Sequence, residues 1–490
     1  MKKKKNIVAS ATSRRSFLKN GLTLAAGFYI VPRHVLGGKG FIAPSDRLIV
    51  AGIGAGGKGE SDINEFFKSG KADIAFLCDV DDRQSATSRG RFPKAKYYKD
   101  HREMLDKESK YFDAVSVSTP DHNHAIQAMA AMQLGKHVYV QKPLTHDIYE
   151  ARMLTEAALK YKVVTQMGNQ GASGDGVRQL MEWYNADVIG HVHDVYVWTD
   201  RPVWPQGIAW PNKTAAIPAE LDWNLWLGTA PQKDYVENIA PFNWRGWWDY
   251  GTGALGDMGC HLIEAPFRVL GLGYPTEATC SVSSYYTGPF RRGYFPESAP
   301  AASHVTLKFE KNNGKEHTIL HWMDGGIQPE RPDELGANET MGDGGNGVIF
   351  VGSKGKMMCD TYGANARLLP LSRNNDVKTP VSIARVPGGA SGHYKQWVEA
   401  CIAGYSSKET KNLSSPFSIA GPLTETVLMG NLAIRSYDIK KARINEPDKF
   451  DFPGRGIKLL WDGANMKITN FDEANQFVKR TYREGWKLGI

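Results

Sequence analysis

Between residues 47 and 166, short apolar runs alternate with segments of helical spacing. Apolar runs bounded by glycine or polar residues predict buried strands, and apolar residues three and four apart predict helices. The expected strands are Leu48–Gly52, Ile74–Cys78, Asp113–Ser118, His137–Val140 and Val163–Gln166, and the expected helices are Gly56–Phe67, Ala125–Leu134 and Ile148–Lys160. This alternation predicts a parallel, doubly wound α/β sheet.

The pattern changes after Gly168. Longer β-type runs follow at Glu277–Tyr286, His304–Phe309, Thr318–Met323 and Gly347–Val351, and helical spacing returns at Ser391–Ala403 and Ile419–Ser436. These runs predict a second, α+β domain that is built on a mostly antiparallel sheet. We therefore expect a leader at 1–43, an α/β domain at 44–168, a sheet domain for substrate and subunit contacts at 169–440, and a C-terminal extension at 441–490 that packs on the other domains.

The N-terminal segment changes how the charge of the chain is interpreted. The 490 residues carry a formal net charge of +8, but residues 1–43 hold six Lys, three Arg and no acidic residue, which leaves −1 for the remainder. Ser13-Arg14-Arg15-Ser16-Phe17-Leu18-Lys19, followed by the apolar run Gly21–Val31, is typical of a bacterial twin-arginine export signal. The charge therefore predicts no nucleic-acid partner, and the signal predicts a periplasmic protein.

Membrane insertion is not expected once the leader is removed. The apolar run of the leader is too short to span a bilayer, and no later run approaches the roughly 18 apolar residues that a spanning helix requires. The five cysteines are scattered without CxxC spacing, at Cys78, Cys260, Cys280, Cys359 and Cys401. We interpret them as buried thiols, and we expect no metal site.

A glycine-rich turn follows the first expected strand and carries the first chemical signal. Gly52, Gly54 and Gly57 form a G-x-G-x-x-G fingerprint between a strand and a helix. Such glycines permit a tight turn, a close approach of backbone to a pyrophosphate, and close packing of helix on strand. The second strand ends at Asp79, where a carboxylate binds the adenosine ribose. Asp79 favours NAD, whereas nearby Arg83 leaves NADP open, so the sequence predicts a Rossmann domain with NAD or NADP.

Three further residues have the chemistry of an active site. Lys142 follows a buried strand, at the edge where parallel sheets bind ligands, although a solvated lysine is an equal alternative from position alone. Asp257 and His261 are four residues apart and share one helix face, so a carboxylate can orient an imidazole that acts as a general base. The alternatives are a helix-start Asp beside a packed His, or a metal pair.

Other histidines and the tryptophans are weaker candidates. We expect one of His122 and His124 to approach the nicotinamide ribose and the other to lie at the surface. We expect His191 and His193 to be structural or solvent-facing. Eight tryptophans crowd residues 198–248; aromatic faces can stack on a sugar ring, but we expect most of the eight to be core and one or two to line a pocket.

Together these motifs resemble the Gfo/Idh/MocA oxidoreductases, the family of glucose–fructose oxidoreductase and inositol dehydrogenase, from about Ser45 to beyond Tyr394. The family's Glu-Lys-Pro motif corresponds to Gln141-Lys142-Pro143, its Thr-Pro-x-x-x-His segment to Thr119, Pro120 and His124, and its Asp-x-x-x-His pair to Asp257 and His261. The resemblance implies a Rossmann domain followed by an open sheet, with the active site between them and His261 as the proton acceptor. Gln141 in place of Glu and Glu264 in place of Asp are departures.

The long form resembles an exported bacterial subgroup of that family, marked by the Trp198–Pro202, Trp244–Trp248 and Met167–Gly171 segments. The cofactor-binding residues expected are Gly52, Gly54, Gly57, Asp79, Arg83, Thr119, Pro120, His124, Gln141 and Asn169. The substrate-binding residues expected are Asn169, Gln170, Trp198, Arg201, Trp244, Arg245 and Trp247, and the catalytic residues expected are Lys142, Asp257 and His261.

These observations predict an NAD(P)-dependent oxidoreductase that acts on a sugar, glycoside or polyol and works as a homo-oligomer. Because no free nicotinamide pool is expected outside the cytoplasm, we expect a tightly bound cofactor that is regenerated in place. One alternative is redox-neutral glycoside cleavage by oxidation, elimination, hydration and reduction. Some members of the superfamily that this chain resembles use NAD in that way. Another is a non-catalytic sugar-binding or partner-binding protein that keeps a Rossmann shell.

Overall fold

The first sheet is parallel and carries the nucleotide fingerprint. The computed structural model describes residues 46–311, 314–378 and 380–489, so the predicted leader with Arg14 and Arg15 lies outside the described residues. Six strands pair in the order β3-β2-β1-β4-β5-β6, all in parallel. Their bounds are β1 Leu48–Ile53, β2 Ala72–Cys78, β3 Lys96–Tyr98, β4 Ala114–Val117, β5 His137–Val140 and β6 Thr165–Met167.

Helices cover both faces of this sheet, and its strands are accordingly buried on both sides. The helices are α3 Lys58–Lys68, α4 Asp82–Arg91, α5 His101–Glu108, α6 Asp121–Gln133 and α7 Ile148–Tyr161. Helix α6 begins four residues before the expected Ala125, because Pro120 stands at its N-cap with φ −59°. Its first turn therefore contains His122, Asn123 and His124, next to the end of β4.

The second sheet has nine strands in the order β15-β14-β13-β7-β12-β11-β8-β18-β19. Only the β7–β12 pair is parallel among these described strands, and the other pairs are antiparallel. The predicted fold class is therefore confirmed. The bounds are β7 Val192–Trp198, β8 Glu277–Val282, β11 Ser303–Lys311, β12 Glu316–Met323, β13 Gly347–Gly352, β14 Gly355–Cys359, β15 Arg367–Leu369, β18 Leu459–Asp462 and β19 Lys467–Ile468.

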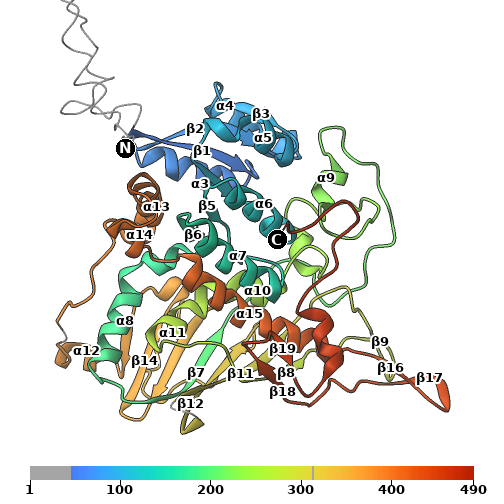
Figure 1. Ribbon diagram of the computed structural model, residues 1–490. Coiled ribbons are helices and arrows are strands. Elements are labelled where there is room, and N and C mark those ends of the chain that lie inside the picture. Colours follow the sequence, from blue (N-terminus) through green and yellow to red (C-terminus); the bar gives the residue numbers. More distant parts are fainter. Residues whose placement is uncertain (1–45, 312–313, 379, 490) are drawn as a thin grey trace, which may run out of the picture. The chain divides into compact units, whose positions relative to one another are not determined.

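Helices lie between the two sheets (Figure 1). They are α8 Asp175–Asn185, α10 Gly253–Leu262, α11 Glu264–Val269 and α15 Phe417–Tyr437. Helix α15 is buried along most of its length and contacts both α7 and β8, so one core joins the two sheets. Residues 48–490 accordingly form one compact unit.

Late segments of the chain return to the first sheet. Helix α13, Gly392–Ala403, packs Trp397 on Phe66 of α3 with ring centroids 4.9 Å apart. Short elements fill the connections: α9 Trp223–Leu227, α12 Arg373–Asp376, α14 Lys408–Lys411, and the paired strands β9 Tyr286–Gly288 with β10 Arg291–Arg292 and β16 Lys441–Arg443 with β17 Glu446–Asp451.

The remaining sequence predictions can be checked against the described residues. The cysteines are free thiols, and all but Cys280 are buried, as expected. His191 and His193 are exposed, as expected. Within the described ranges, no helix combines the length and apolarity needed to cross a bilayer, and no group of three or more His, Cys, Asp or Glu side chains is arranged to hold a metal ion.

Candidate active site

A cavity of about 410 Å³ lies at the carboxyl ends of β1, β2, β4 and β5. Ligands of open α/β sheets bind at this edge, where the strand order changes direction. Here the order reverses between β1 and β4. The predicted residues that line the cavity are Gly54, Gly57, Asp79, Thr119, Pro120, Gln141, Lys142, Gln170, Arg201, Trp244, Arg245, Asp257 and His261.

Gly52, Gly54 and Gly57 have structural roles that differ in part from those predicted. A Cβ on Gly52 would lie 2.6 Å from Ile63 Cδ1, so this glycine allows α3 to pack on β1. A Cβ on Gly54, with φ +79°, would lie 2.6 Å from the Ser118 carbonyl oxygen. Gly57 has φ +53° and open space above it, so it does not have the predicted packing role. It leaves room for a phosphate in front of the first turn of α3, and the residues present therefore fit a dinucleotide.

Asp79 is already bonded to the glycine loop. Its Oδ2 accepts hydrogen bonds from the backbone N–H groups of Ala55 at 2.8 Å and Gly56 at 3.1 Å. Burial nevertheless raises the pKa of Asp79 to about 6. Its Oδ1 accepts a hydrogen bond from the Asp81 backbone N–H at 3.0 Å, and Asp79 lines the cavity; its contact with ribose hydroxyls stays a prediction.

Arg83 does not line the cavity. It forms a bidentate pair with Asp81, with Nε and Nη2 at 2.9 and 2.6 Å from the two carboxylate oxygens. The predicted contact of Arg83 with a 2′-phosphate is therefore wrong for this arrangement, because the guanidinium is already neutralised by Asp81. The surroundings of Asp79 favour NAD.

Lys142 and Asp257 meet across the cavity. Lys142 Nζ donates to Asp257 Oδ1 at 2.7 Å and to the Asp257 carbonyl oxygen at 2.9 Å. Arg245 Nε lies 3.5 Å from the same carboxylate oxygen. Burial favours the protonated acid, but the attraction of Lys142 and Arg245 outweighs it, so the pKa of Asp257 lies below its usual value. The loop-borne lysine and the helix α10 carboxylate thus form one ion pair.

His261 is buried one turn further along α10. The residue is 7% exposed, and its Nδ1 has no hydrogen-bond partner among the described residues. Burial, and then repulsion by Lys142, lower the pKa of His261 to about 3, so the imidazole is neutral at pH 7. Asp257 accepts no hydrogen bond from His261, because that carboxylate is turned to Lys142 and Arg245, so the predicted orientation of the imidazole by Asp257 is not made through a hydrogen bond.

Tyr362 contacts His261 and was missed by the sequence reasoning. Its ring lies edge-on to the imidazole at 4.8 Å between centroids, and it lines the cavity. Its φ of +66° is unusual for a bulky residue and indicates backbone strain at a functional site. A Cβ on Gly171 would lie 2.8 Å from Tyr362 Cα, so this glycine admits the strained loop. The Met167–Gly171 motif was the one available signal.

The contacts of Gln141 explain why glutamine stands where the family pattern has glutamate. Its Nε2 donates to Asp62 Oδ2 at 2.7 Å, and Ser118 Oγ donates to the same oxygen at 2.9 Å. Asp62 is completely buried and pairs with Lys58, another cavity residue that the prediction missed. A glutamate at position 141 would place a second carboxylate beside buried Asp62, whereas the Gln141 amide N–H donates a hydrogen bond to it.

His122 and His124 do not face the cavity. His124 Nδ1 lies 2.8 Å from the Pro143 carbonyl oxygen and Nε2 lies 2.7 Å from that of Thr119. The predicted cofactor contact of His124 is therefore wrong: the ring joins the ends of β4 and β5. His122 is completely buried, which contradicts the expectation that one of the pair lies at the surface.

The predicted substrate residues separate into two groups. Gln170, Arg201, Trp244 and Arg245 line the cavity, and Arg245 stacks on Trp244 with its guanidinium carbon 4.3 Å from the ring centroid. The predictions for Trp198 and Trp247 are wrong because both are buried away from the lining. Asn169 is buried between the lining residues Gly168 and Gln170, and its amide atoms have no partner among the described residues, so its contact stays a prediction. Trp198 packs with Met323 and Met341 on the second sheet, and Trp247 packs on Trp210 at 4.7 Å.

Comparisons with known proteins agree with this fold. Residues 48–169 match the model of an oxidoreductase family with an NAD-binding Rossmann fold, and residues 194–281 match the C-terminal alpha/beta domain of that family. A solved structure, levoglucosan dehydrogenase in complex with NADH and levoglucosan, is similar at a TM-score of 0.52 and 15% identity, over 80% of this chain and 98% of that chain.

Curated relatives match over shorter segments. A glycosyl hydrolase family 109 protein of Shewanella pealeana is 28% identical over 170 residues, which is 30% of this chain and 37% of the relative. An alpha-N-acetylgalactosaminidase of Shewanella oneidensis is 30% identical over 129 residues, which is 24% of this chain and 28% of the relative. The matched segments therefore span well under half the length of these relatives.

Proposed function

The chain belongs to the Gfo/Idh/MocA family of NAD-binding oxidoreductases, and on that premise we propose that it oxidises a hydroxyl of a sugar, glycoside or polyol with a tightly held NAD. The observation that carries the proposal is the convergence of Lys142, Asp257 and His261 on the cavity that also contains the glycine loop. A carbohydrate substrate is supported by the sugar ligand of levoglucosan dehydrogenase and by the names of the glycoside hydrolase relatives.

The side chains supply proton transfer and charge stabilisation. Bound NAD, held by Gly54, Gly57 and Asp79, would supply a hydride acceptor for the carbon that carries the reacting hydroxyl. His261 is neutral and takes the hydroxyl proton. Lys142 donates a hydrogen bond to the same oxygen as negative charge develops there. Asp257 holds the Lys142 ammonium in place through its 2.7 Å contact, and Arg245 and Gln170 are placed to hold the rest of the sugar.

The test compares three proteins loaded with NAD. Lys142→Ala and His261→Ala each remove one proposed chemical group, and Lys71→Ala removes a lysine that pairs with Glu399 at 2.7 Å and does not line the cavity. We expect the first two to lose turnover of a sugar panel by about 100-fold or more while binding NAD normally, and the third to keep its turnover. A folded Lys142→Ala, His261→Ala double variant with near-normal turnover contradicts the proposal.

A second candidate is redox-neutral glycoside cleavage. The glycoside hydrolase names of the curated relatives favour it. In this reaction one ring hydroxyl is oxidised, the neighbouring carbon loses a proton, the aglycone leaves, water adds, and the hydride returns to the sugar. A nitrophenyl glycoside separates the two reactions: nitrophenol release without added cofactor, and without a net change in bound NAD, identifies cleavage.

We also propose that the protein is exported through its twin-arginine segment and acts as a homo-oligomer. Arg14 and Arg15, with the apolar run that follows them, support export. Replacement of both arginines by lysine is expected to leave the protein in the cytoplasmic fraction, and unchanged periplasmic recovery contradicts export by this route.

Light scattering of the exported form measures the number of subunits in the assembly, and a monomer at all concentrations contradicts oligomerisation.

A further inference from the structure

Residues 220–250, which we call the cover, form one wall of the cofactor cavity. The cover contains α9 and has a small apolar core of its own that includes Trp223, Trp226 and Tyr250. Its residues Leu225, Trp226, Ala240, Pro241, Trp244 and Arg245 line the cavity. The cover is therefore part of the binding site, although it is far from the glycine loop in the sequence.

The cover joins the Rossmann domain beside the expected adenosine position. Asp222 N donates to the Val80 carbonyl oxygen at 2.9 Å, and Asp82 N donates to the Glu220 carbonyl oxygen at 3.2 Å, which makes a short antiparallel bridge. This bridge begins one residue after Asp79. A dinucleotide whose ribose is held by Asp79 thus has the cover next to its adenosine end.

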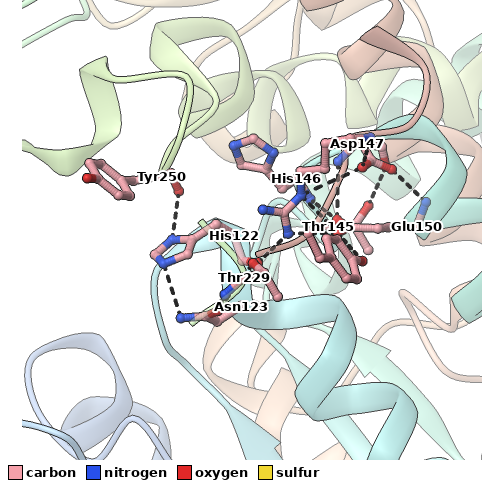
Figure 2. A network of polar contacts seen from close by, with 10 residues as sticks. His122, Asn123, Thr145, His146, Asp147, Glu150, Thr229 and Tyr250 are labelled. Atoms are coloured by element: carbon pink, nitrogen blue, oxygen red, sulfur yellow. Dashed lines mark hydrogen bonds and ion pairs between the residues drawn. The ribbon is translucent and has the colours of Figure 1, made fainter. Parts of the chain in front are cut away.

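A second attachment lies at the first turn of α6 (Figure 2). Thr229 Oγ1 donates to the His122 carbonyl oxygen at 2.6 Å, and Asn123 Nδ2 donates to the Trp226 carbonyl oxygen at 3.1 Å. The His122 backbone N–H donates to the Tyr250 carbonyl oxygen at 3.2 Å. His122 and Asn123 are buried. Most of these contacts are made between neutral groups, each of which contributes modestly to a closed state.

Residues 478–488, which we call the strap, add charged contacts to the cover and run beside α9 (Figure 1). Arg483 Nε donates to the Gly228 carbonyl oxygen at 3.1 Å. Its Nη1 donates to Asn224 Oδ1 at 2.7 Å and to Gln232 Oε1 at 2.6 Å, and its Nη2 donates to the Asn224 carbonyl oxygen at 2.8 Å. The Arg483 guanidinium therefore bonds to both α9 and the turn that follows it.

The part of the strap just before Arg483 is fixed to the Rossmann domain. Arg480 Nη2 and Tyr482 Oη donate to the same Glu150 oxygen at 2.8 and 2.6 Å. The Arg480 backbone N–H donates to Asp147 Oδ2 at 3.1 Å, and Figure 2 shows Asp147 and Glu150 at the start of α7. Glu150 is completely buried, so this anchor is a desolvated ion pair that is costly to break. The strap thus connects a fixed anchor to the cover.

We propose that the strap is a latch that keeps the cover closed on bound NAD, with Arg483 as the positioning residue that sets the rate of NAD release. Release of an enclosed ligand is limited by opening of the element that covers it. Opening of the cover separates the Arg483 guanidinium from its acceptors on the cover, whereas the Arg480–Glu150 anchor stays intact. The inference rests on the proposed function only in requiring that NAD binds.

The experiment measures exchange of bound NAD for isotope-labelled NAD, by mass spectrometry of the denatured protein at successive times. Arg483→Gln is expected to release NAD about 10- to 100-fold faster than the unaltered protein, because several hydrogen bonds of a charged donor are lost. Arg455→Gln is the matched control: it removes a half-buried arginine that pairs with Asp438 at 3.0 Å and does not line the cavity. Its exchange rate is expected to stay unchanged.

A second variant separates a latch from general loosening. Asn224→Ala removes one Arg483 acceptor on the cover and leaves the anchor untouched. It is expected to accelerate exchange by itself, and to add less than its own effect in an Arg483→Gln background, because the two changes remove one shared contact.

The outcomes separate this inference from the proposed function. Exchange in folded Arg483→Gln and Asn224→Ala at the rate of the control overturns the latch. Fully additive effects of the two changes also overturn it. Exchange needs no sugar, so a protein that retains NAD through the latch but oxidises no carbohydrate contradicts only the proposed function. If the unaltered protein carries no dinucleotide at all, both are contradicted.

Discussion

Asp79 is expected to bind the cofactor but to lower the stability of the protein when NAD is absent. Burial raises its pKa from 3.8 to about 6, although the backbone N–H groups of Asp81, Ala55 and Gly56 favour the charged form. At 1.36 kcal/mol for each pH unit, keeping the carboxylate charged at pH 7 costs the NAD-free fold about 3 kcal/mol. The pKa of Asp79 is higher in the folded than in the unfolded protein. Asp79 therefore contributes to the free energy of unfolding below pH 3.8, and this contribution is lost as the pH rises from 3.8 through 6.

Asp79→Asn removes the charge and keeps an acceptor oxygen. The free energy of unfolding of the NAD-free variant is expected to rise at pH 7 by up to about 3 kcal/mol. NAD affinity is expected to fall by about 10- to 100-fold, because hydrogen bonds from the ribose hydroxyls to a carboxylate become neutral ones. Stability and affinity thus change in opposite directions, as at a site where function is kept at the expense of stability.

Urea unfolding and NAD titration measure the two effects. In the unaltered protein, Asp79 alone is expected to lower the unfolding free energy by about 1 kcal/mol between pH 5 and pH 7, and this contribution disappears in Asp79→Asn. Asp106→Asn on α5, an exposed acid in the same domain, is the control. An Asp79→Asn protein that binds NAD as tightly as the unaltered one, with unchanged stability, refutes the reasoning.

Three further predictions concern single side chains. Tyr362→Phe keeps the ring against His261 and removes the hydroxyl, so kcat is expected to fall by about tenfold or less if the ring only packs, and a steeper fall with an altered pH profile assigns the hydroxyl a proton-transfer role. Burial lowers the pKa of His122 to about 3, so only the unfolded chain takes up a proton at His122 as the pH falls from 6.5 to 5. This protonation lowers the free energy of unfolding of the unaltered protein by about 2 kcal/mol over that range. Urea titrations of His122→Asn are expected to show a decrease that is smaller by this amount. Trp198→Ala is expected to cost about 3 to 5 kcal/mol of stability with an unchanged KM for the sugar, and a raised KM contradicts its core assignment.

Local sequence patterns were sufficient for the framework of the site. The parallel sheet follows from short apolar runs, and the cavity edge follows from where those runs end, because strand carboxyl ends converge in a doubly wound sheet. Gly54, Gly57, Asp79 and Lys142 could therefore be placed from the chain alone. His261 could be placed on a helix, but its neighbours could not.

Contacts between distant segments were decided only by the tertiary structure. Spacing put Asp257 beside His261, yet the carboxylate turns to Lys142, which is 115 residues away, because an ammonium is the stronger partner. Trp198 and Trp244 look alike in the sequence, but one packs on the second sheet and the other lines the cavity. Nothing local marks Tyr362 or Arg483.

The sequence by itself determined the strands, the glycine turn and the residue types of an NAD-dependent oxidoreductase, because these depend on short-range periodicity and backbone sterics. The tertiary structure alone decided which charges pair, which aromatic rings face the cofactor cavity, and that residues 478–488 bridge the cover to the Rossmann domain. Those features depend on burial and on close approach of segments hundreds of residues apart, and no local pattern encodes either.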